Sequence, residues 1–295
     1  RAGLYVGNVQ SAPRWIDDTT GAPAWSPSGE QLAWGDDHGL RIWNRATDDI
    51  SRLALGPIVG RPAWSPDGAF VVFLDAESRE LQRLEINSGD VMPLASVFEG
   101  PDGVIRPPMV TRGGPAWSPD GASIAFVCWD GYGDELCVVG PGGGLHEQLT
   151  TLGVAEERAG SAARSSVTGM AWSPDGAALA VSVQAEQQGA AAGVYRIEMS
   201  ERSGERLTKL TTNAPLIWEA ATNDLIFSAR VEGRSDVYRL PAAGGSPEAL
   251  TTALTDGARD PAMDANGNLA VVTGSAIAIL RPGSDDVMSV EEPGL

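Results

Sequence analysis

Few residues of this sequence have the types and spacing that catalysis or transition-metal binding requires. Only two histidines, His38 and His146, occur in 295 residues. A multi-histidine centre is therefore excluded, and zinc, iron or copper sites built from nitrogen and sulfur ligands are not expected. The Gly-X-Ser-X-Gly motif of a nucleophile elbow is absent, and the glycines of 141–145 lack the Gly-Lys-Ser/Thr of a phosphate-binding loop. The sequence therefore favours a non-catalytic protein.

Carboxylates are more numerous than any other group that could hold a ligand. Asp36 and Asp37 directly precede His38, and Asp256 lies near Asp260. Carboxylate and carbonyl oxygens are the ligands of calcium, so these four aspartates are the candidate metal ligands and calcium is the one cofactor that stays open. No Asp-X-Asp-X-Asp-Gly spacing supports such a site, and ordinary polar turns are the alternative interpretation.

One motif that would position these residues recurs along the whole chain. It consists of Ala-Trp-Ser-Pro-Asp-Gly, or a close variant, followed by an apolar run. Proline presets φ at the first corner of a turn and glycine accepts the positive φ that closes it, so each copy predicts a β-hairpin. A third and a fourth strand follow each hairpin. The copies span residues 23–34, 62–73, 115–126 and 170–181, with two degraded copies at 216–227 and 261–272.

This motif resembles the TolB-like, WD-like repeat of the β-propeller family, over nearly the full chain. The resemblance implies an all-β, six-bladed β-propeller of four-stranded antiparallel blades, with residues 1–295 as a single domain; a seven-bladed ring is the alternative. Two further strands are expected within residues 1–20, before the first motif copy, and should close the ring by pairing with the last blade. The repeated tryptophans are expected to pack between blades rather than to bind a ligand. They are Trp25, Trp64, Trp117, Trp172 and Trp218.

Four long connections are expected on one face of the ring. In an antiparallel blade, the turn between strands two and three and the link to the next blade lie on the same side. The long members are residues 97–114, 129–134, 152–169 and 184–192. Long loops on a rigid scaffold often carry function, so a binding surface is predicted there, with neutral loop lengthening as the alternative. The candidate contact residues are Arg106, Arg112, Trp129, Asp130 and Tyr132.

The two cysteines lie on neighbouring strands of the third repeat. Antiparallel pairing would place Cys128 nearly opposite Cys137, close enough for a disulfide if the register allows it. Two buried thiols are the alternative. The even cysteine count and the resemblance to exported proteins favour an extracytoplasmic location, which means the periplasm, the cell surface or secretion.

Charge and hydropathy exclude other classes of partner. The chain has 21 basic and 39 acidic side chains, a net charge of −18. Such a surface repels phosphate, so neither nucleic acid nor an anionic membrane is an expected partner. No apolar run is long enough to insert into a bilayer.

The expected function is therefore a non-catalytic, extracytoplasmic binding module, the sensor or scaffold part of a larger anchored protein. It would act as a monomer and hold a protein partner or small ligand on the long-loop face. A lyase or hydrolase with its site at the channel mouth is one alternative, and a carbohydrate- or peptide-binding propeller is another.

Overall fold

The computed structural model describes residues 3–8, 11–19, 21–53, 56–97, 114–129, 134–151, 165–185, 192–212, 215–264, 266–274, 276–282 and 287–291. Regular structure in these ranges consists of β-strands. Among the residues described, no helix has the length and apolar character that a membrane crossing requires.

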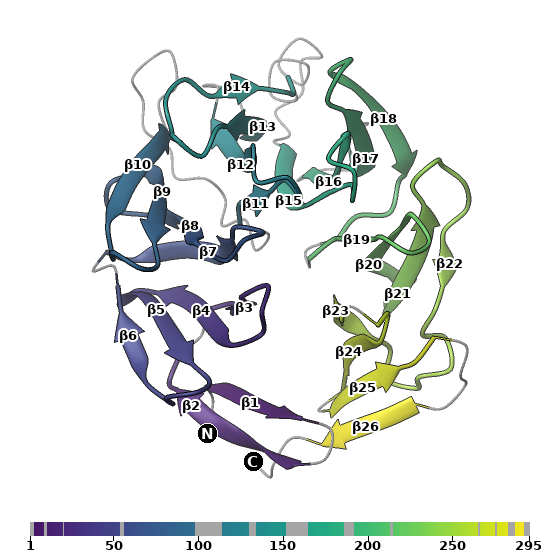
Figure 1. The fold of residues 1–295 in the computed structure, drawn as a ribbon. Coiled ribbons are helices and arrows are strands. Elements are labelled where there is room, and N and C mark those ends of the chain that lie inside the picture. Colours follow the sequence, from purple (N-terminus) through teal and green to yellow (C-terminus); the bar gives the residue numbers. More distant parts are fainter. Residues whose placement is uncertain are drawn as a thin grey trace.

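Six four-stranded antiparallel sheets form a ring, which confirms the predicted six-bladed propeller (Figure 1). Blade 1 contains β3 (Ala24–Trp25), β4 (Gln31–Asp36), β5 (Gly39–Asn44) and β6 (Ile50–Arg52). Blade 2 contains β7 (Ile58–Trp64), β8 (Phe70–Asp75), β9 (Glu80–Glu85) and β10 (Val91–Ser96). Blade 3 contains β11 (Ala116–Trp117), β12 (Ile124–Trp129), β13 (Asp134–Val139) and β14 (Glu147–Gln148).

The remaining blades follow the same order from the channel to the rim. Blade 4 contains β15 (Ser165–Trp172), β16 (Ala178–Ala185), β17 (Gly193–Glu198) and β18 (Ser203–Thr208). Blade 5 contains β19 (Ile217–Glu219), β20 (Asp224–Val231), β21 (Arg234–Pro241) and β22 (Glu248–Ala249). Blade 6 contains β23 (Arg259–Met263), β24 (Leu269–Thr273), β25 (Ala276–Leu280) and β26 (Val287–Glu291).

The Ser-Pro-Asp-Gly turn joins the first two strands of a blade through a small hydrogen-bond network. In blade 2 the buried Ser65 Oγ accepts a bond from the Phe70 amide at 2.9 Å and donates to Asp67 Oδ1 at 2.6 Å. Gly68 takes φ of 72°, a conformation that favours glycine. Blades 3 and 4 repeat the serine–aspartate bond at 2.6 Å. The motif is therefore a local device that fixes each hairpin.

The core lies between the blades. Leu40 and Ile42 of blade 1 pack against Trp64 and Phe73 of blade 2, and Trp64 Nε1 donates to the carbonyl oxygen of Ala24 at 3.0 Å. Trp172 and Trp218 are buried in the same way. The prediction that the repeated tryptophans pack between blades is wrong for Trp25, because 46% of its surface is exposed.

The first two strands form a separate sheet, here called the closing hairpin. Its strands are β1 (Leu4–Asn8) and β2 (Ser11–Asp17). Leu4 and Ile16 pack against Leu32, Trp34 and Trp43 of blade 1, and the hairpin lies at the rim between β26 and blade 1 (Figure 1). In the described part of the chain its only ladder joins β1 to β2, so pairing with the last blade stays a prediction.

An ion-pair cluster ties the closing hairpin to blade 1. The guanidinium of Arg41 pairs with both Asp17 and Asp36, and all three side chains are largely buried. Asp17 also accepts a hydrogen bond from Trp34 Nε1 at 3.2 Å. Burial alone would raise the pKa of Asp36, but hydrogen bonds from Arg41, the His38 amide and Thr19 outweigh it and lower the pKa.

Candidate binding site on the long-loop face

The antiparallel blades divide the connections between two faces. Each blade begins its first strand, and joins its second strand to its third, on one side of the ring. The four long connections leave the strands on that side, which is called the long-loop face from here on. The Ser-Pro-Asp-Gly turns lie on the opposite side. The scaffold that would hold a binding surface is therefore as the sequence predicts.

The predicted contact residues are placed only in part. Trp129 is the last residue of β12 and stands opposite Asp134 of β13. Only 9% of its surface is exposed, so most of the indole belongs to the packing of the blade. The other four residues, Arg106, Arg112, Asp130 and Tyr132, lie outside the described residues.

Arg61 is a candidate that the sequence interpretation missed. It lies on β7, the innermost strand of blade 2, three residues before the repeat tryptophan Trp64. Its guanidinium is half-buried and has no ion pair or hydrogen bond among the described residues. Desolvation by burial lowers the pKa of Arg61 below its ordinary value. An unpaired, partly desolvated cation is a group that can attract an anion.

Arg61 also lies where the longest connection enters blade 3. Gly114 is the last residue of this connection and has φ of 60°, and a Cβ at this position would overlap the carbonyl oxygen of Arg61. Only glycine allows so close an approach of the two backbones. The end of the 97–114 connection is therefore fixed beside Arg61.

The repeat register could have identified Arg61. The residues three positions before the repeat tryptophan, or before Met263 in the sixth copy, are Ala22, Arg61, Gly114, Gly169, Pro215 and Asp260. Arg61 is the one basic residue in this set, and Asp260 is the one acidic residue. Asp260 takes φ of 50° and pairs with Arg259 at 3.1 Å. Comparing one register position across the six copies separates Arg61 from the small residues of the motif.

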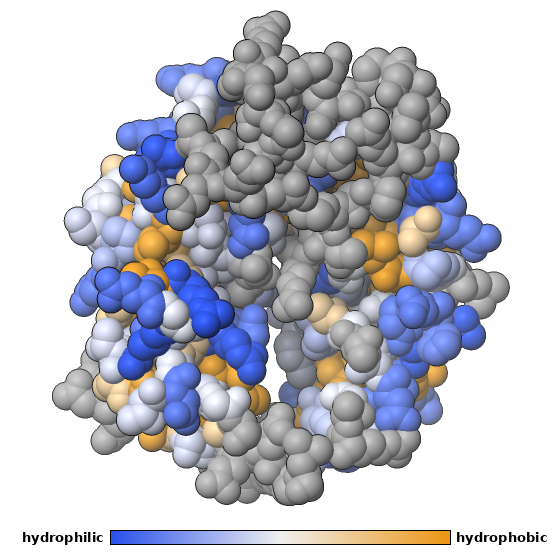
Figure 2. All heavy atoms as spheres, turned by 180° about the vertical axis from the view of Figure 1, so that it is seen from behind, coloured by the Kyte–Doolittle hydropathy of each residue, from blue (hydrophilic) through white to orange (hydrophobic). Residues whose placement is uncertain are grey.

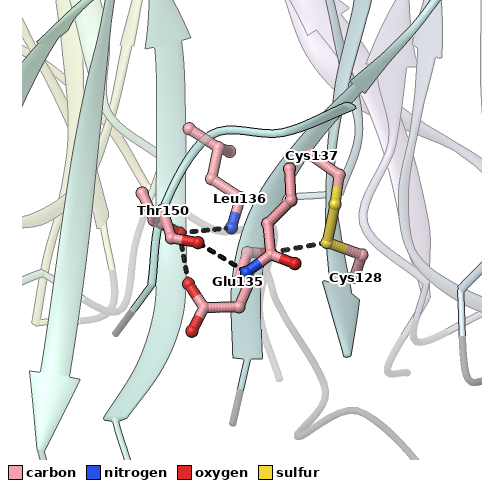
Figure 3. Close-up of a disulfide and its surroundings, with 6 residues drawn as sticks. Cys128, Glu135, Leu136, Cys137 and Thr150 are labelled. Atoms are coloured by element: carbon pink, nitrogen blue, oxygen red, sulfur yellow. Dashed lines mark hydrogen bonds between the residues drawn. A yellow bond between two sulfur atoms is a disulfide. The ribbon is translucent and has the colours of Figure 1, made fainter. Parts of the chain in front are cut away.

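The disulfide between Cys128 and Cys137 lies in blade 3, with a Cα–Cα distance of 5.8 Å (Figure 3). The two residues are diagonal rather than opposite, because Cys128 pairs with Glu135 and Cys137 with Phe126. Both side chains face blade 2 in the core between the two blades. The disulfide therefore anchors the two strands whose connection, 130–133, belongs to the long-loop face.

Buried acids beside the disulfide have structural partners. Glu135 accepts a hydrogen bond from Thr150 Oγ1, which in turn accepts one from the Leu136 amide at 2.9 Å (Figure 3). Blade 5 repeats this arrangement with Thr251 and Asp236 at 2.9 Å. The same hydrogen-bond arrangement, a threonine hydroxyl between a carboxylate and a backbone amide, occurs in two blades. This recurrence indicates that these carboxylates hold the outer strands in place.

The candidate metal ligands do not form one cluster. Asp36 is engaged by Arg41 and Thr19, and Asp260 is engaged by Arg259. Asp37 is exposed, and Asp256 lies beside Gly274. In the ranges that the structure describes, no group of three or more His, Cys, Asp or Glu side chains is arranged to hold a metal ion.

The two histidines lie on different faces. His38 is exposed in the turn between β4 and β5, on the long-loop face. His146 precedes β14, and its ring lies edge-on to Phe126 with the centroids 5.6 Å apart. Partial burial lowers the pKa of His146. The structure therefore does not bring the two imidazoles together.

Comparison with protein-family models finds no match, and comparison with curated proteins finds none either. Solved structures do match. TolB from Acinetobacter baumannii is 19% identical, with a TM-score of 0.56 over 92% of this chain and 64% of that chain. A puromycin-hydrolysing peptidase of Mycobacterium tuberculosis is 14% identical, with a TM-score of 0.63 over 94% of this chain and 46% of that chain.

A catalytically inactive virginiamycin B lyase from Staphylococcus aureus is also similar. It is 14% identical, with a TM-score of 0.63 over 99% of this chain and 88% of that chain. At these identities the likeness shows the fold alone. The chain is a six-bladed propeller with distant structural similarity to TolB, and its fold is shared by binding modules and enzymes.

Proposed function

We propose that this propeller is a non-catalytic binding module that holds an acidic segment of a protein partner on its long-loop face. Arg61 is the residue that pairs with a carboxylate of the partner. The observation that carries the proposal is its half-buried guanidinium, which no acid among the described residues neutralises. Arginine stays charged even when burial lowers its pKa, and its planar fork matches a carboxylate.

The charge of the chain determines what Arg61 can contribute. A net charge of −18 repels an acidic segment at long range. A single cation near the channel therefore contributes orientation and selectivity rather than most of the affinity, as charged groups at interfaces commonly do. The long connections around blades 3 and 4 would supply the remaining contact surface.

An extracytoplasmic location fits the chemistry of the two cysteines. Disulfides persist in oxidising compartments and are rare in the cytosol. The Cys128–Cys137 bond therefore supports a periplasmic, cell-surface or secreted protein.

Selective binding of acidic peptides tests the proposal. Immobilised 15-residue peptides, each carrying two Asp or Glu residues, are compared with otherwise identical peptides that carry Asn or Gln. The wild-type protein should retain a subset of the acidic peptides at least tenfold better than their amide versions. Arg61→Gln should lose this preference, because the neutral amide cannot form the ion pair.

Arg52→Gln is the matched control, since Arg52 is an exposed arginine on β6 at the rim of blade 1. It should bind the acidic peptides as the wild-type protein does. Equal retention of the acidic and amide peptides by the wild-type protein would contradict the proposal. Loss of binding by both variants would assign the effect to overall charge and would contradict it as well.

A further inference from the structure

One repeat position distinguishes the last blade from the other five. On the third strand, the residue that faces the next blade pairs with the second-strand residue ten positions after the repeat tryptophan, or nine positions after Met263 in the shorter sixth copy. In five blades it is fully buried, with 0% of its surface exposed: Leu40, Leu81, Leu136, Val194 and Val237. In blade 6 the same position is Ile277, paired with Val272, and it is 43% exposed. The apolar face of blade 6 is therefore built like the others but is not covered.

The face of blade 1 that lies toward blade 6 also has an uncovered residue at a repeat position. Trp64 is 8% exposed because blade 1 covers it, whereas Trp25 at the same repeat position is 46% exposed. The apolar side chains of the closing hairpin pack on Leu32, Trp34 and Trp43 of blade 1, which lie on β4 and β5. The tryptophan on the innermost strand β3 is left uncovered.

The closing hairpin takes the place of half a blade. It lies at the rim, and the described residues place no strand between it and the channel (Figure 1). The space-filling view shows that the channel is open in the lower half of the molecule, on the side of the ring where the closing hairpin lies, with apolar surface along part of its border (Figure 2). Within the described residues β1 pairs only with β2, so its other edge can accept a further strand.

We propose that an extended segment of a partner protein adds to β1 and fills the inner half of this position. The segment would form a β-ladder with β1 and place apolar side chains between Trp25 and Ile277. The interface between blades 1 and 2 is the template, because Leu40 and Trp64, which occupy the same two repeat positions, lie there in one buried cluster. Strand addition of this kind gives affinity through main-chain bonds and specificity through alternate side chains.

The chemistry of the site limits the segment. Its side chains that face the cleft must be apolar, since they meet an indole and an isoleucine. Because the net charge of the chain is −18, a segment without acidic residues is favoured. This separates the proposal from the acidic segment proposed for the long-loop face, and the two sites can be tested independently.

The probe is a peptide with the sequence of residues 121–127, which includes most of the second strand of blade 3 and carries no acidic side chain. It supplies one extended strand that can pair with β1. Titration into the purified protein, followed by calorimetry and by tryptophan fluorescence, should show saturable binding. A peptide with prolines at both positions 125 and 126 should bind at least tenfold more weakly, because proline removes a ladder hydrogen bond.

Ile277→Asp should weaken binding of the probe at least tenfold, because it places a charge on the apolar wall. Ile50→Asp is the matched control: Ile50 has the same exposure, 43%, but lies on β6 of blade 1. It should leave the affinity unchanged. Both substituted positions are exposed, so both variants should fold, which circular dichroism would verify.

Four results would overturn the proposal. Three concern the probe: an absence of saturable binding up to millimolar peptide, equal effects of the two isoleucine variants, and equal binding of the proline peptide. A dimer of the wild-type protein that dissociates in Ile277→Asp would also overturn it, because the occupant would then be a second copy of this chain. Arg61→Gln should bind the probe normally, so failure here is distinguishable from failure of the proposed function.

Discussion

At the scale of single residues, the repeat motif works through atoms that lie close together in the sequence. Ser118 Oγ donates to Asp120 at 2.6 Å and accepts from the Ser123 amide at 2.9 Å, so three backbone or side-chain groups of one turn satisfy each other. These contacts need no residue from outside the turn. They explain why the motif is recognisable even where the following strand varies.

The carboxylates of these turns make stability depend on pH in the acid range. Hydrogen bonds from the serine hydroxyls lower the pKa of Asp67, Asp120 and Asp175. Hydrogen bonds from Arg14 and then Trp43 lower the pKa of Asp48 to about 2. Because these folded-state values lie below the unfolded value of about 3.9, their stabilisation is complete at higher pH and is lost as pH falls from about 4 toward 2.

We therefore expect the urea midpoint to fall steeply below pH 4. Asp48→Asn should be less stable than the wild-type protein at pH 6, and this difference should shrink as pH approaches 2. A difference that stays constant between pH 6 and pH 2.5 would show that Asp48 does not contribute through its charge. Urea unfolding at each pH, followed by circular dichroism, measures both quantities.

At the scale of elements, each blade is a four-stranded sheet with apolar residues on both faces. Val72 and Leu74 of β8 face blade 3, whereas Val71 and Phe73 face blade 1. Both sets are buried, which explains the continuous apolar runs that follow each turn. Strands of this kind cannot stay soluble alone, so a blade is stable only between neighbours.

The disulfide of blade 3 is expected to contribute measurably to stability. It joins β12 to β13 across a sequence separation of 9 residues. Closing a loop of this size in the unfolded chain corresponds to about 2–3 kcal/mol. Reduction with dithiothreitol should therefore lower the free energy of unfolding by about this amount in urea titrations.

The variant with both Cys128 and Cys137 replaced by alanine is the control for this measurement. It should be destabilised even without the reductant, and dithiothreitol should not change it further. If the reductant leaves the wild-type midpoint unchanged although thiol titration shows two free thiols, the estimate is wrong.

At the scale of the whole molecule, ring closure is the feature that the repeats do not provide. Five interfaces join successive blades, but the sixth joins blade 6 to blade 1 across a two-stranded hairpin. Leu4 and Ile16 cover part of blade 1, and Arg41 with Asp17 fastens the hairpin to it. Within the described residues, the hairpin is therefore held by a few contacts between the N-terminal segment and blade 1.

Arg41→Met should loosen this closure. The substitution keeps much of the side-chain volume but leaves two largely buried carboxylates, Asp17 and Asp36, without their cation. Removing one partner of a buried ion pair costs about 3–5 kcal/mol. We expect a lower free energy of unfolding and faster hydrogen exchange in β1 and β2, measured by mass spectrometry.

Arg45→Met is the matched control, because Arg45 pairs with Glu30 at 3.8 Å and both side chains are exposed. Such a surface pair contributes about 0–1 kcal/mol. Equal stability losses in the two variants, or exchange in β1 and β2 that does not change in Arg41→Met, would contradict this role.

The sequence by itself determined the hairpins and the side on which the long connections lie, and it favoured six blades over seven. It could do so because the turn chemistry is local and repeats six times, and because antiparallel topology fixes which connections share a face. Arg61 was missed although it directly precedes the second motif copy, since its importance depends on burial and on the absence of an ion-pairing acid among the described residues. The diagonal placement of Cys128 and Cys137 could not be predicted from the sequence either, because strand register varies by one residue between otherwise similar hairpins.

Only the tertiary structure decided the exposure of individual repeat positions. Trp25 and Trp64 occupy the same place in identical Pro-Ala-Trp-Ser-Pro contexts, yet one is exposed and the other buried. The difference lies in what stands beside each blade in the ring, a contact between residues far apart in the chain. The local sequence determines the strands and turns of each blade, whereas the solvent exposure of the blade's faces is determined by its neighbours in space.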